Sequence, residues 1–229
     1  MARGKLLSSF DEAVADVQDS ATILFGGFQS RGVATNLILA LHRKGVKGIT
    51  AVCNDACGGW RGSIDVAYLI EARRVKKLIT SFPVAGSPSL VSACETQWRN
   101  GELEVELNPQ GTLAERIRAG GAGIAAFWTP TGAGTQFGEG KETRVFGGRE
   151  HVLERAIKGD FAFISAAKTD TLGNLVYHGM ARNFNPVMAT AAAVTIVEAK
   201  ELVQAGEIDP ERVITPGVYV DRIVVAAKG

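Results

Sequence analysis

Short apolar runs alternate along the first half of the chain with longer stretches in which apolar residues recur at helical spacing. The apolar runs predict buried strands at 22–25, 49–53, 77–82 and 103–107. The amphipathic stretches predict helices at 10–17, 35–43, 64–73, 88–98 and 112–119. Because strands and helices alternate in this order, we expect an α/β fold with a largely parallel sheet and helices on both faces.

The residue pattern changes in the second half of the chain. Glycine and threonine are dense between Gly120 and Gly148, and Phe127 and Trp128 lie among them, which predicts a functional loop or short antiparallel strands. Beyond it we expect strands at 161–166, 175–178 and 195–197, a turn at 169–173 and a helix at 185–193. No repeat or linker is visible, so residues 1–229 are interpreted as one domain.

Composition narrows the possible partners and the compartment. Hydrophobic residues make up 46% and charged residues 21% of the chain, and the net charge of +1 comes without a long basic block. This pattern argues against nucleic acid as a partner. The start of the chain lacks the apolar stretch of a signal peptide, and no apolar run is long enough to span a bilayer. We therefore expect a cytoplasmic protein with no membrane partner.

The cysteines and histidines do not form a recognisable site. Cys53, Cys57 and Cys94 form an odd set without a secretory signal, which favours reduced, buried thiols. Cys53 and Cys57 have no second cysteine pair or histidine nearby in sequence, so no metal is expected. The three histidines are scattered and are interpreted as exposed or satisfied side chains.

A glycine-rich segment between the first strand and the second helix is the first candidate binding site. It consists of Gly26, Gly27, Phe28, Gln29, Ser30, Arg31 and Gly32. Glycines at a strand end let a ligand approach the backbone, and the helix that follows favours an anion at its N-terminus. The spacing matches neither a dinucleotide fingerprint nor a P-loop, so a tight turn without a ligand explains it equally well.

Two amides follow other strands of the same expected sheet. Asn54 comes directly after the second strand, and Gln110 comes shortly after the fourth. The carboxyl ends of parallel strands converge on one crevice, so these side chains are candidates for the same site. Uncharged amides suit a carbonyl or an oxyanion better than a metal, although capping of the local turns would explain each of them as well.

Five motifs give the chain a resemblance to a known family. They lie at 19–28 with Gly32, 102–123, 127–132, 181–186 and 215–223, in one register along nearly the whole chain. Together they resemble the A (alpha) subunit of family I CoA-transferases, of the 3-oxoacid or 3-oxoadipate type. The long motif at 102–123 is the most specific of the five.

The resemblance implies an enzyme subunit that is inactive alone. Such a protein would help to exchange CoA between a small acyl-CoA, such as succinyl-CoA, and a 3-oxo acid. The nucleophile would be a glutamate of a partner B subunit, in an A2B2 assembly. In the family this glutamate lies in a motif similar to Ser-Glu-Asn-Gly, which is absent from this chain. The most similar segment here contains Glu139, which is interpreted as a solvated loop carboxylate.

The resemblance also implies roles for the candidate residues. Asn54 and Gln110 would contact the acyl carbonyl or the oxyanion, and the 26–32 segment would approach CoA. CoA and acyl-CoA would be substrates, with no permanently bound cofactor. The implied partner leads us to expect a contiguous exposed apolar patch near residues 120–148 and near Phe127 and Trp128.

Departures from the family pattern leave alternatives open. Ala34, Asp55 and Cys57 replace the usual residues. Asp55 and Cys57 leave room for a related hydrolase of CoA thioesters. A non-catalytic ligand-binding domain is the third possibility. Arg31 could neutralise a second substrate carboxylate or could be a solvated loop arginine.

Overall fold

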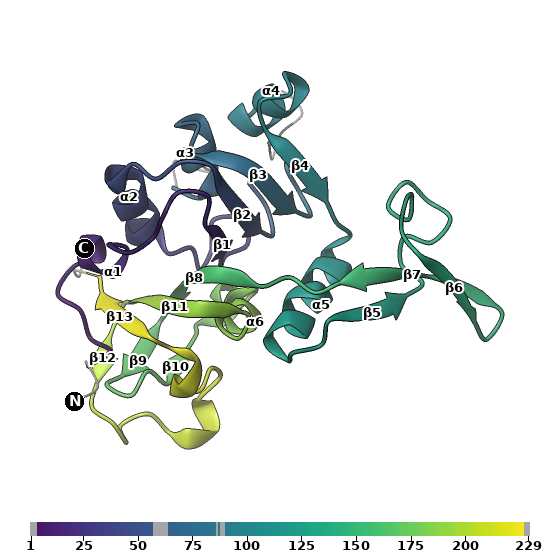
Figure 1. Ribbon diagram of the computed structural model, residues 1–229. Coiled ribbons are helices and arrows are strands. Elements are labelled where there is room, and N and C mark those ends of the chain that lie inside the picture. Colours follow the sequence, from purple (N-terminus) through teal and green to yellow (C-terminus); the bar gives the residue numbers. More distant parts are fainter. Residues whose placement is uncertain (1–3, 57–63, 86, 88–89, 227–229) are drawn as a thin grey trace.

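A seven-stranded parallel sheet forms the centre of the molecule (Figure 1). The computed structural model describes residues 4–56, 64–85, 87 and 90–226. The strand order is β13-β11-β8-β1-β2-β3-β4. The strands are β1 (Thr22–Phe25), β2 (Ile49–Cys53), β3 (Val75–Thr80), β4 (Glu104–Leu107), β8 (Gly159–Ala166), β11 (Ala192–Ala199) and β13 (Arg222–Val225).

The order of the strands places a switch point at the middle of the sheet. From β1 the chain proceeds outward through β2, β3 and β4, and then returns to β8, which pairs with the other side of β1. From β8 it proceeds in the opposite direction through β11 to β13. In open parallel sheets, ligands bind beside the carboxyl ends of the strands at such a reversal.

Helices cover both faces of the sheet, as the sequence predicted. Ile23 and Phe25 of β1 belong to one apolar core, whereas Leu24 between them belongs to the other. The first core includes side chains of α1 (Phe10–Ala13), α2 (Thr35–Lys44), α3 (Val66–Glu71) and α4 (Ala93–Arg99). The second includes side chains of α5 (Gln110–Gly121) and α6 (Asn185–Ala189). The parallel α/β fold is therefore confirmed.

Two smaller sheets accompany the main one. β10 (Leu175–Val176), β9 (Lys168–Asp170) and β12 (Leu202–Val203) form the first, near the short helical turns η2 (Gly179–Ala181), η3 (Pro210–Arg212) and η4 (Gly217–Tyr219). β5 (Ala126–Thr129), β7 (Arg149–Arg155) and β6 (Thr143–Phe146) form the second, which is antiparallel. It projects from the body as an arm, residues 126–155 (Figure 1).

Several predicted boundaries were wrong. The first helix ends at Ala13 instead of 17, and the helix from Asn185 ends at Ala189 because residues from Ala192 onward pair with β8 in β11. The helix expected from 88 begins at Ala93, after a capping box at Ser92, and residues 88–89 lie outside the described part. In that described part, none of the helices is long and apolar enough to cross a bilayer.

Candidate active site

The two amides selected from the sequence are in direct contact. Gln110 donates a hydrogen bond from Nε2 to Oδ1 of Asn54, with the atoms 2.7 Å apart. Ser81, the residue after β3, donates to the same oxygen at 3.0 Å. Asn54 is only 2% exposed, whereas Gln110 lies at the surface. The carboxyl ends of β2, β3 and β4 thus meet in one polar cluster, as parallel pairing predicted.

Asp55 fixes the orientation of this cluster. Its Oδ2 accepts a hydrogen bond from Asn54 Nδ2 at 2.7 Å and another from the backbone N–H of Gln29 at 3.0 Å. Asp55 is 9% exposed, so its charge is held by these donors rather than by solvent. The departure from the family pattern at this position therefore links the amide pair to the glycine-rich loop.

The start of α5 places Gln110 in the cluster. The sequence predicted a helix from Thr112, but the helix begins two residues earlier, after Pro109. Proline presets a φ close to the helical value, so the chain enters the helix at Gln110. No side chain caps this N-terminus, and its first backbone N–H groups lie beside the Gln110 side chain.

The glycine-rich loop has an unusual backbone. Gln29 and Ser30 both have positive φ, at 45° and 62°, which is uncommon for residues with a Cβ. Phe28 and Arg31 close the turn by exchanging backbone hydrogen bonds of 3.0 and 2.9 Å. Strained backbone of this kind persists only where its surroundings hold it, and it is concentrated at functional sites.

Two asparagines of the 181–186 motif hold the loop. Asn183 donates to the carbonyl of Arg31 and accepts from the N–H of Gly27, at 2.8 and 3.2 Å. Asn185 is fully buried and donates to the carbonyl of Gly32 at 2.9 Å. A Cβ at Gly32 would overlap the Ala181 carbonyl. The resemblance marked this motif, but its role as a clamp on the loop emerges only from the structure.

The anion expected at the N-terminus of α2 is the protein's own carboxylate. Glu198 of β11 accepts hydrogen bonds from the backbone N–H groups of Asn36 and Leu37 at 2.8 and 3.3 Å, and from Asn36 Nδ2 at 2.8 Å. Burial raises the pKa of Glu198, and the bonds from Asn36 offset part of this rise. Sequence reasoning missed Glu198. Ala34, the N-cap, makes no side-chain cap.

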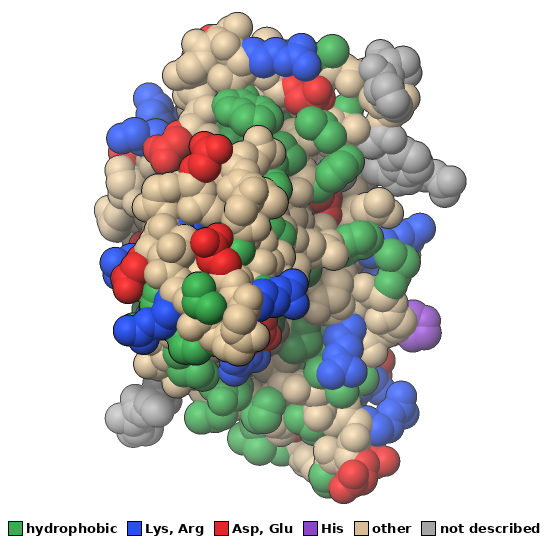
Figure 2. Space-filling view, turned by 90° about the vertical axis from the view of Figure 1, so that its right-hand side faces the viewer, with side chains coloured by type: hydrophobic (Ala, Val, Ile, Leu, Met, Phe, Trp, Pro, Cys, Tyr) green, Lys and Arg blue, Asp and Glu red, His purple; other side chains and the backbone are tan. Residues whose placement is uncertain are grey.

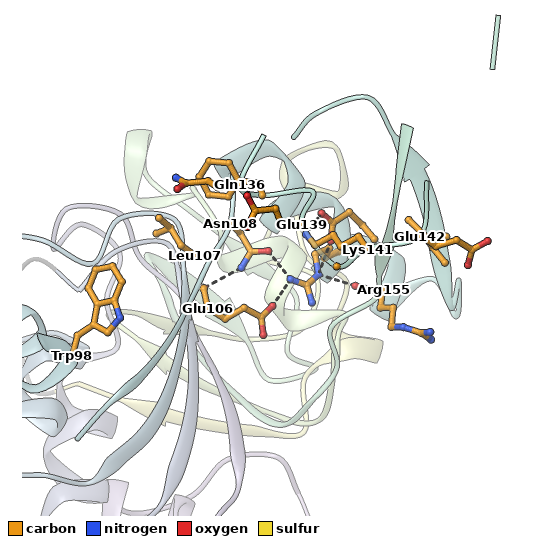
Figure 3. Close-up of a pocket in the computed structure, with 14 residues that line it drawn as sticks. Trp98, Glu106, Leu107, Asn108, Gln136, Glu139, Lys141, Glu142 and Arg155 are labelled. Carbon is orange, nitrogen blue, oxygen red and sulfur yellow. Dashed lines mark hydrogen bonds and ion pairs between the residues drawn. The ribbon is translucent and has the colours of Figure 1, made fainter. Parts of the chain in front are cut away.

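A cavity of about 570 Å³ lies between the end of β4 and the arm (Figure 3). Within it Glu106 and Asn108 accept hydrogen bonds from Arg116 of α5, at 2.6 and 2.5 Å. Burial disfavours the charge on Glu106, but bonds from Arg116 and Lys77 keep the pKa of this carboxyl below its usual value. The network ties the main sheet to the base of the arm.

The buried thiols are not suited to nucleophilic chemistry. Burial raises the pKa of Cys53 well above its usual value and that of Cys94 to about 11, so both are protonated at neutral pH. Cys57 lies outside the described residues. Among the residues that are described, no group of three or more histidine, cysteine or acidic side chains could hold a metal ion.

Comparison with known proteins decides the family. The coenzyme A transferase family model matches residues 7–226. The chain belongs to the coenzyme A transferase family. This transferase chain is 49% identical over 226 residues to the A subunit of a probable succinyl-CoA:3-ketoacid coenzyme A transferase of Bacillus subtilis (strain 168), covering 98% of this chain and 91% of the relative.

Further relatives agree with this assignment. The transferase chain is 46% identical to the A subunit of the 3-oxoadipate CoA-transferase of Acinetobacter baylyi (strain ATCC 33305 / BD413 / ADP1), covering 96% of this chain and 94% of that one. An acyl-CoA transferase of E. coli O157:H7, solved as a thioester complex with CoA, has the same fold with a TM-score of 0.84 at 23% identity. That match covers 98% of this chain but only 48% of the E. coli chain, so the transferase chain spans about half of that protein.

Proposed function

We propose that this chain is the A subunit of a CoA-transferase that exchanges CoA between succinyl-CoA and a 3-oxo acid. The observation that carries the proposal is the contact between Gln110 and Asn54 beside the clamped 26–32 loop. The names of the two relatives reported above supply the substrate class. CoA and acyl-CoA are substrates in this proposal, and the cytoplasmic location stays a prediction.

Gln110 is the group best placed to bind the acyl oxygen. A side-chain amide carries two N–H donors, and Gln110 uses one of them on Asn54. The other is available at the surface, where it can stabilise the negative charge that develops on the acyl oxygen. Asn54 is buried and receives bonds from both Gln110 and Ser81, so we assign it the role of holding Gln110 in place.

The reaction also needs a nucleophile, which we assign to a glutamate of a partner B subunit. Its carboxylate would attack the acyl carbonyl and expel CoA as a thiolate, leaving an acyl-glutamyl anhydride. The thiolate would then attack the glutamyl carbonyl, release the first acid and leave a glutamyl-CoA thioester. A second acid would take the CoA by the reverse steps and regenerate the glutamate.

The hydrolase alternative depended on Asp55 and Cys57. Asp55 is only 9% exposed, and its Oδ2 accepts hydrogen bonds from Asn54 and Gln29, so water has little access to its carboxylate; Cys57 lies outside the described residues. A general base for water needs a free lone pair within reach of that water. This geometry favours transfer over hydrolysis.

Co-expression with a candidate B subunit, followed by exchange assays over a panel of carboxylic acids, tests the function. We expect the complex to move CoA from succinyl-CoA to 3-oxo acids faster than it releases free CoA. If the complex instead cleaved the thioester at the same rate with and without an acceptor acid, the hydrolase alternative would replace the transferase.

The arm is the surface that we propose for the B subunit. Val145 and Phe146 are 64% and 42% exposed, and β6 contains no buried residue. Trp128 packs against Phe146 with ring centroids 5.8 Å apart, and Arg144 lies over both rings. A three-stranded sheet needs an apolar face to pack against, and Trp, Phe and Arg are typical anchors of protein interfaces.

The space-filling view shows the end of the molecule that carries the arm, where hydrophobic side chains lie among lysines and arginines (Figure 2). Val145 and Phe146 are exposed within residues 120–148, where the sequence led us to expect an apolar patch, but as successive residues of β6 they point to opposite faces of the arm. Phe127 and Trp128, in contrast, are half-buried in the arm itself.

Replacing Phe146 by aspartate should weaken association with the B subunit by about ten-fold or more, because it places a charge in an apolar contact. Size-exclusion chromatography with light scattering on the mixed subunits measures the loss, and also tests the A2B2 stoichiometry. Val218→Asp is the matched control, since Val218 is 82% exposed and lies outside the arm. Dissociation by Val218→Asp alone would place the interface elsewhere.

A further inference from the structure

A second cavity, of about 590 Å³, opens beside the glycine-rich loop. Its lining includes Ser30 and Arg31 of the loop, Ser165 at the end of β8, and Glu198 and Lys200 at the end of β11. It therefore lies at the carboxyl edge of the sheet, at the switch point between β1 and β8. This is the part of an open parallel sheet where ligands bind.

Two cations of this cavity have no partner within the described part of the chain. Neither the guanidinium of Arg31 nor the ammonium of Lys200 has a hydrogen bond or an ion pair there. Nearby Lys168, in contrast, is paired with Glu201 at 3.0 Å. The hydroxyl oxygen of Ser30 is buried and also has no hydrogen-bond partner in the described structure.

The one acidic side chain among the described residues that line the cavity does not neutralise these cations. The carboxylate of Glu198 is already satisfied by three hydrogen bonds from Asn36 and Leu37 at the start of α2. The charge of Lys200 lowers the pKa of Glu198, but it is the smallest of the contributions, and burial raises this pKa overall. The cavity consequently presents an excess of positive charge, which suits an anionic oxygen group.

The distance from the amide pair fits a short substrate. Asn54 follows β2, and β8 is two strands away across β1, which is about 10 Å at the usual strand spacing. An acyl chain that begins at Gln110 and ends in a second carboxylate would extend across the loop toward the cavity. Arg31, which belongs to that loop, lines the cavity.

We propose that Arg31 and Lys200 bind the distal carboxylate of a dicarboxylic acyl group and so select dicarboxylic over monocarboxylic acyl-CoA. The inference rests on the proposed function, because it places a second subsite in the same reaction. The phosphates of CoA are the other anionic oxygen groups that the cavity could take. The two sources differ in one respect: every acyl-CoA carries the phosphates, whereas only a dicarboxylic one carries the second carboxylate.

The test compares succinyl-CoA with butyryl-CoA as donors for the assembled enzyme carrying Arg31→Gln or Lys200→Gln. We expect kcat/KM for succinyl-CoA to fall about ten-fold or more, mainly through KM, and by a clearly larger factor than kcat/KM for butyryl-CoA. Lys168→Gln is the matched control, because its ammonium is already paired with Glu201. Arg31→Lys keeps the positive charge but cannot bind a carboxylate through two parallel N–H groups. It should therefore recover part of the lost kcat/KM for succinyl-CoA.

Each result has a distinct meaning. An equal loss with both donors would assign the cavity to the CoA phosphates and overturn the proposal. An unchanged preference for succinyl-CoA in variants that melt at the wild-type temperature would overturn it as well. If the wild-type complex exchanged CoA between no pair of acids, the proposed function itself would fail first. If a variant melts below the wild-type temperature, Arg31→Lys replaces it in the comparison. Its preference between succinyl-CoA and butyryl-CoA then tests the proposal.

Discussion

Purified without a partner, this chain is expected to catalyse no measurable CoA exchange, and addition of the B subunit should restore it. The reason is that neither of the two candidate carboxylates of this chain is placed to attack a thioester. Asp55, which lies beside Asn54 in the polar cluster, is only 9% exposed, and its Oδ2 is held by Asn54 and Gln29, so a thioester has little access to its carboxylate. Glu139 lines the cavity of Figure 3, and neither Asn54 nor Gln110 lines that cavity, so Glu139 is not placed with the amide pair.

An exchange assay with labelled acid, run on the separate subunits and on their mixture, measures this dependence. Glu139→Ala is the internal control, and the mixture containing it should exchange CoA at the normal rate. Robust exchange by the isolated chain that disappears with Glu139→Ala would identify a nucleophile in this chain and refute the division of labour proposed here.

Removal of the Gln110 side chain should lower kcat of the assembled enzyme by about 100-fold or more. The lost N–H is a donor to the oxygen that becomes negative in the transition state, so the effect should appear in kcat and kcat/KM together. The free energy of unfolding should change little, because Gln110 lies at the surface and its side chain makes a single hydrogen bond to the described residues.

Gln110→Ala therefore requires kinetics and a thermal melt on the same preparation. Gln18→Ala is the matched control, since Gln18 is also exposed and lies before β1, at the amino ends of the strands, away from the proposed site. Normal turnover by Gln110→Ala would show that the contact between Gln110 and Asn54 has no role in the reaction. A large loss of stability would show that the amide pair is structural.

The strand pattern was sufficient to predict the meeting of the amides. Buried runs separated by amphipathic helices imply parallel strands, and parallel strands bring their carboxyl ends together. Asn54 and Gln110 are 56 residues apart and yet bonded, as that reasoning required. Their roles in the reaction stay predictions, which the kinetics of the Gln110 variant test.

Other parts of the site could not be predicted from local patterns. Glu198 meets α2 across 162 residues, and nothing in the sequence around it distinguishes an acid that caps a distant helix from a solvated one. The arm was recognised only as a loop or short strands, because its strands carry few apolar residues and depend on pairing with one another. Strand β13 was missed for a different reason: its short apolar run follows a loop without a preceding helix.

The clamp on the glycine-rich loop has a consequence for the order of folding. Asn183 reaches Arg31 across 152 residues and Asn185 reaches Gly32 across 153, so the loop at residues 26–32 is held by groups that the ribosome makes much later. Contacts of such long range close late, after the entropy of a large chain segment has been lost. The loop therefore reaches its final conformation only after the second half of the chain has docked, and a nascent chain cannot bind substrate early.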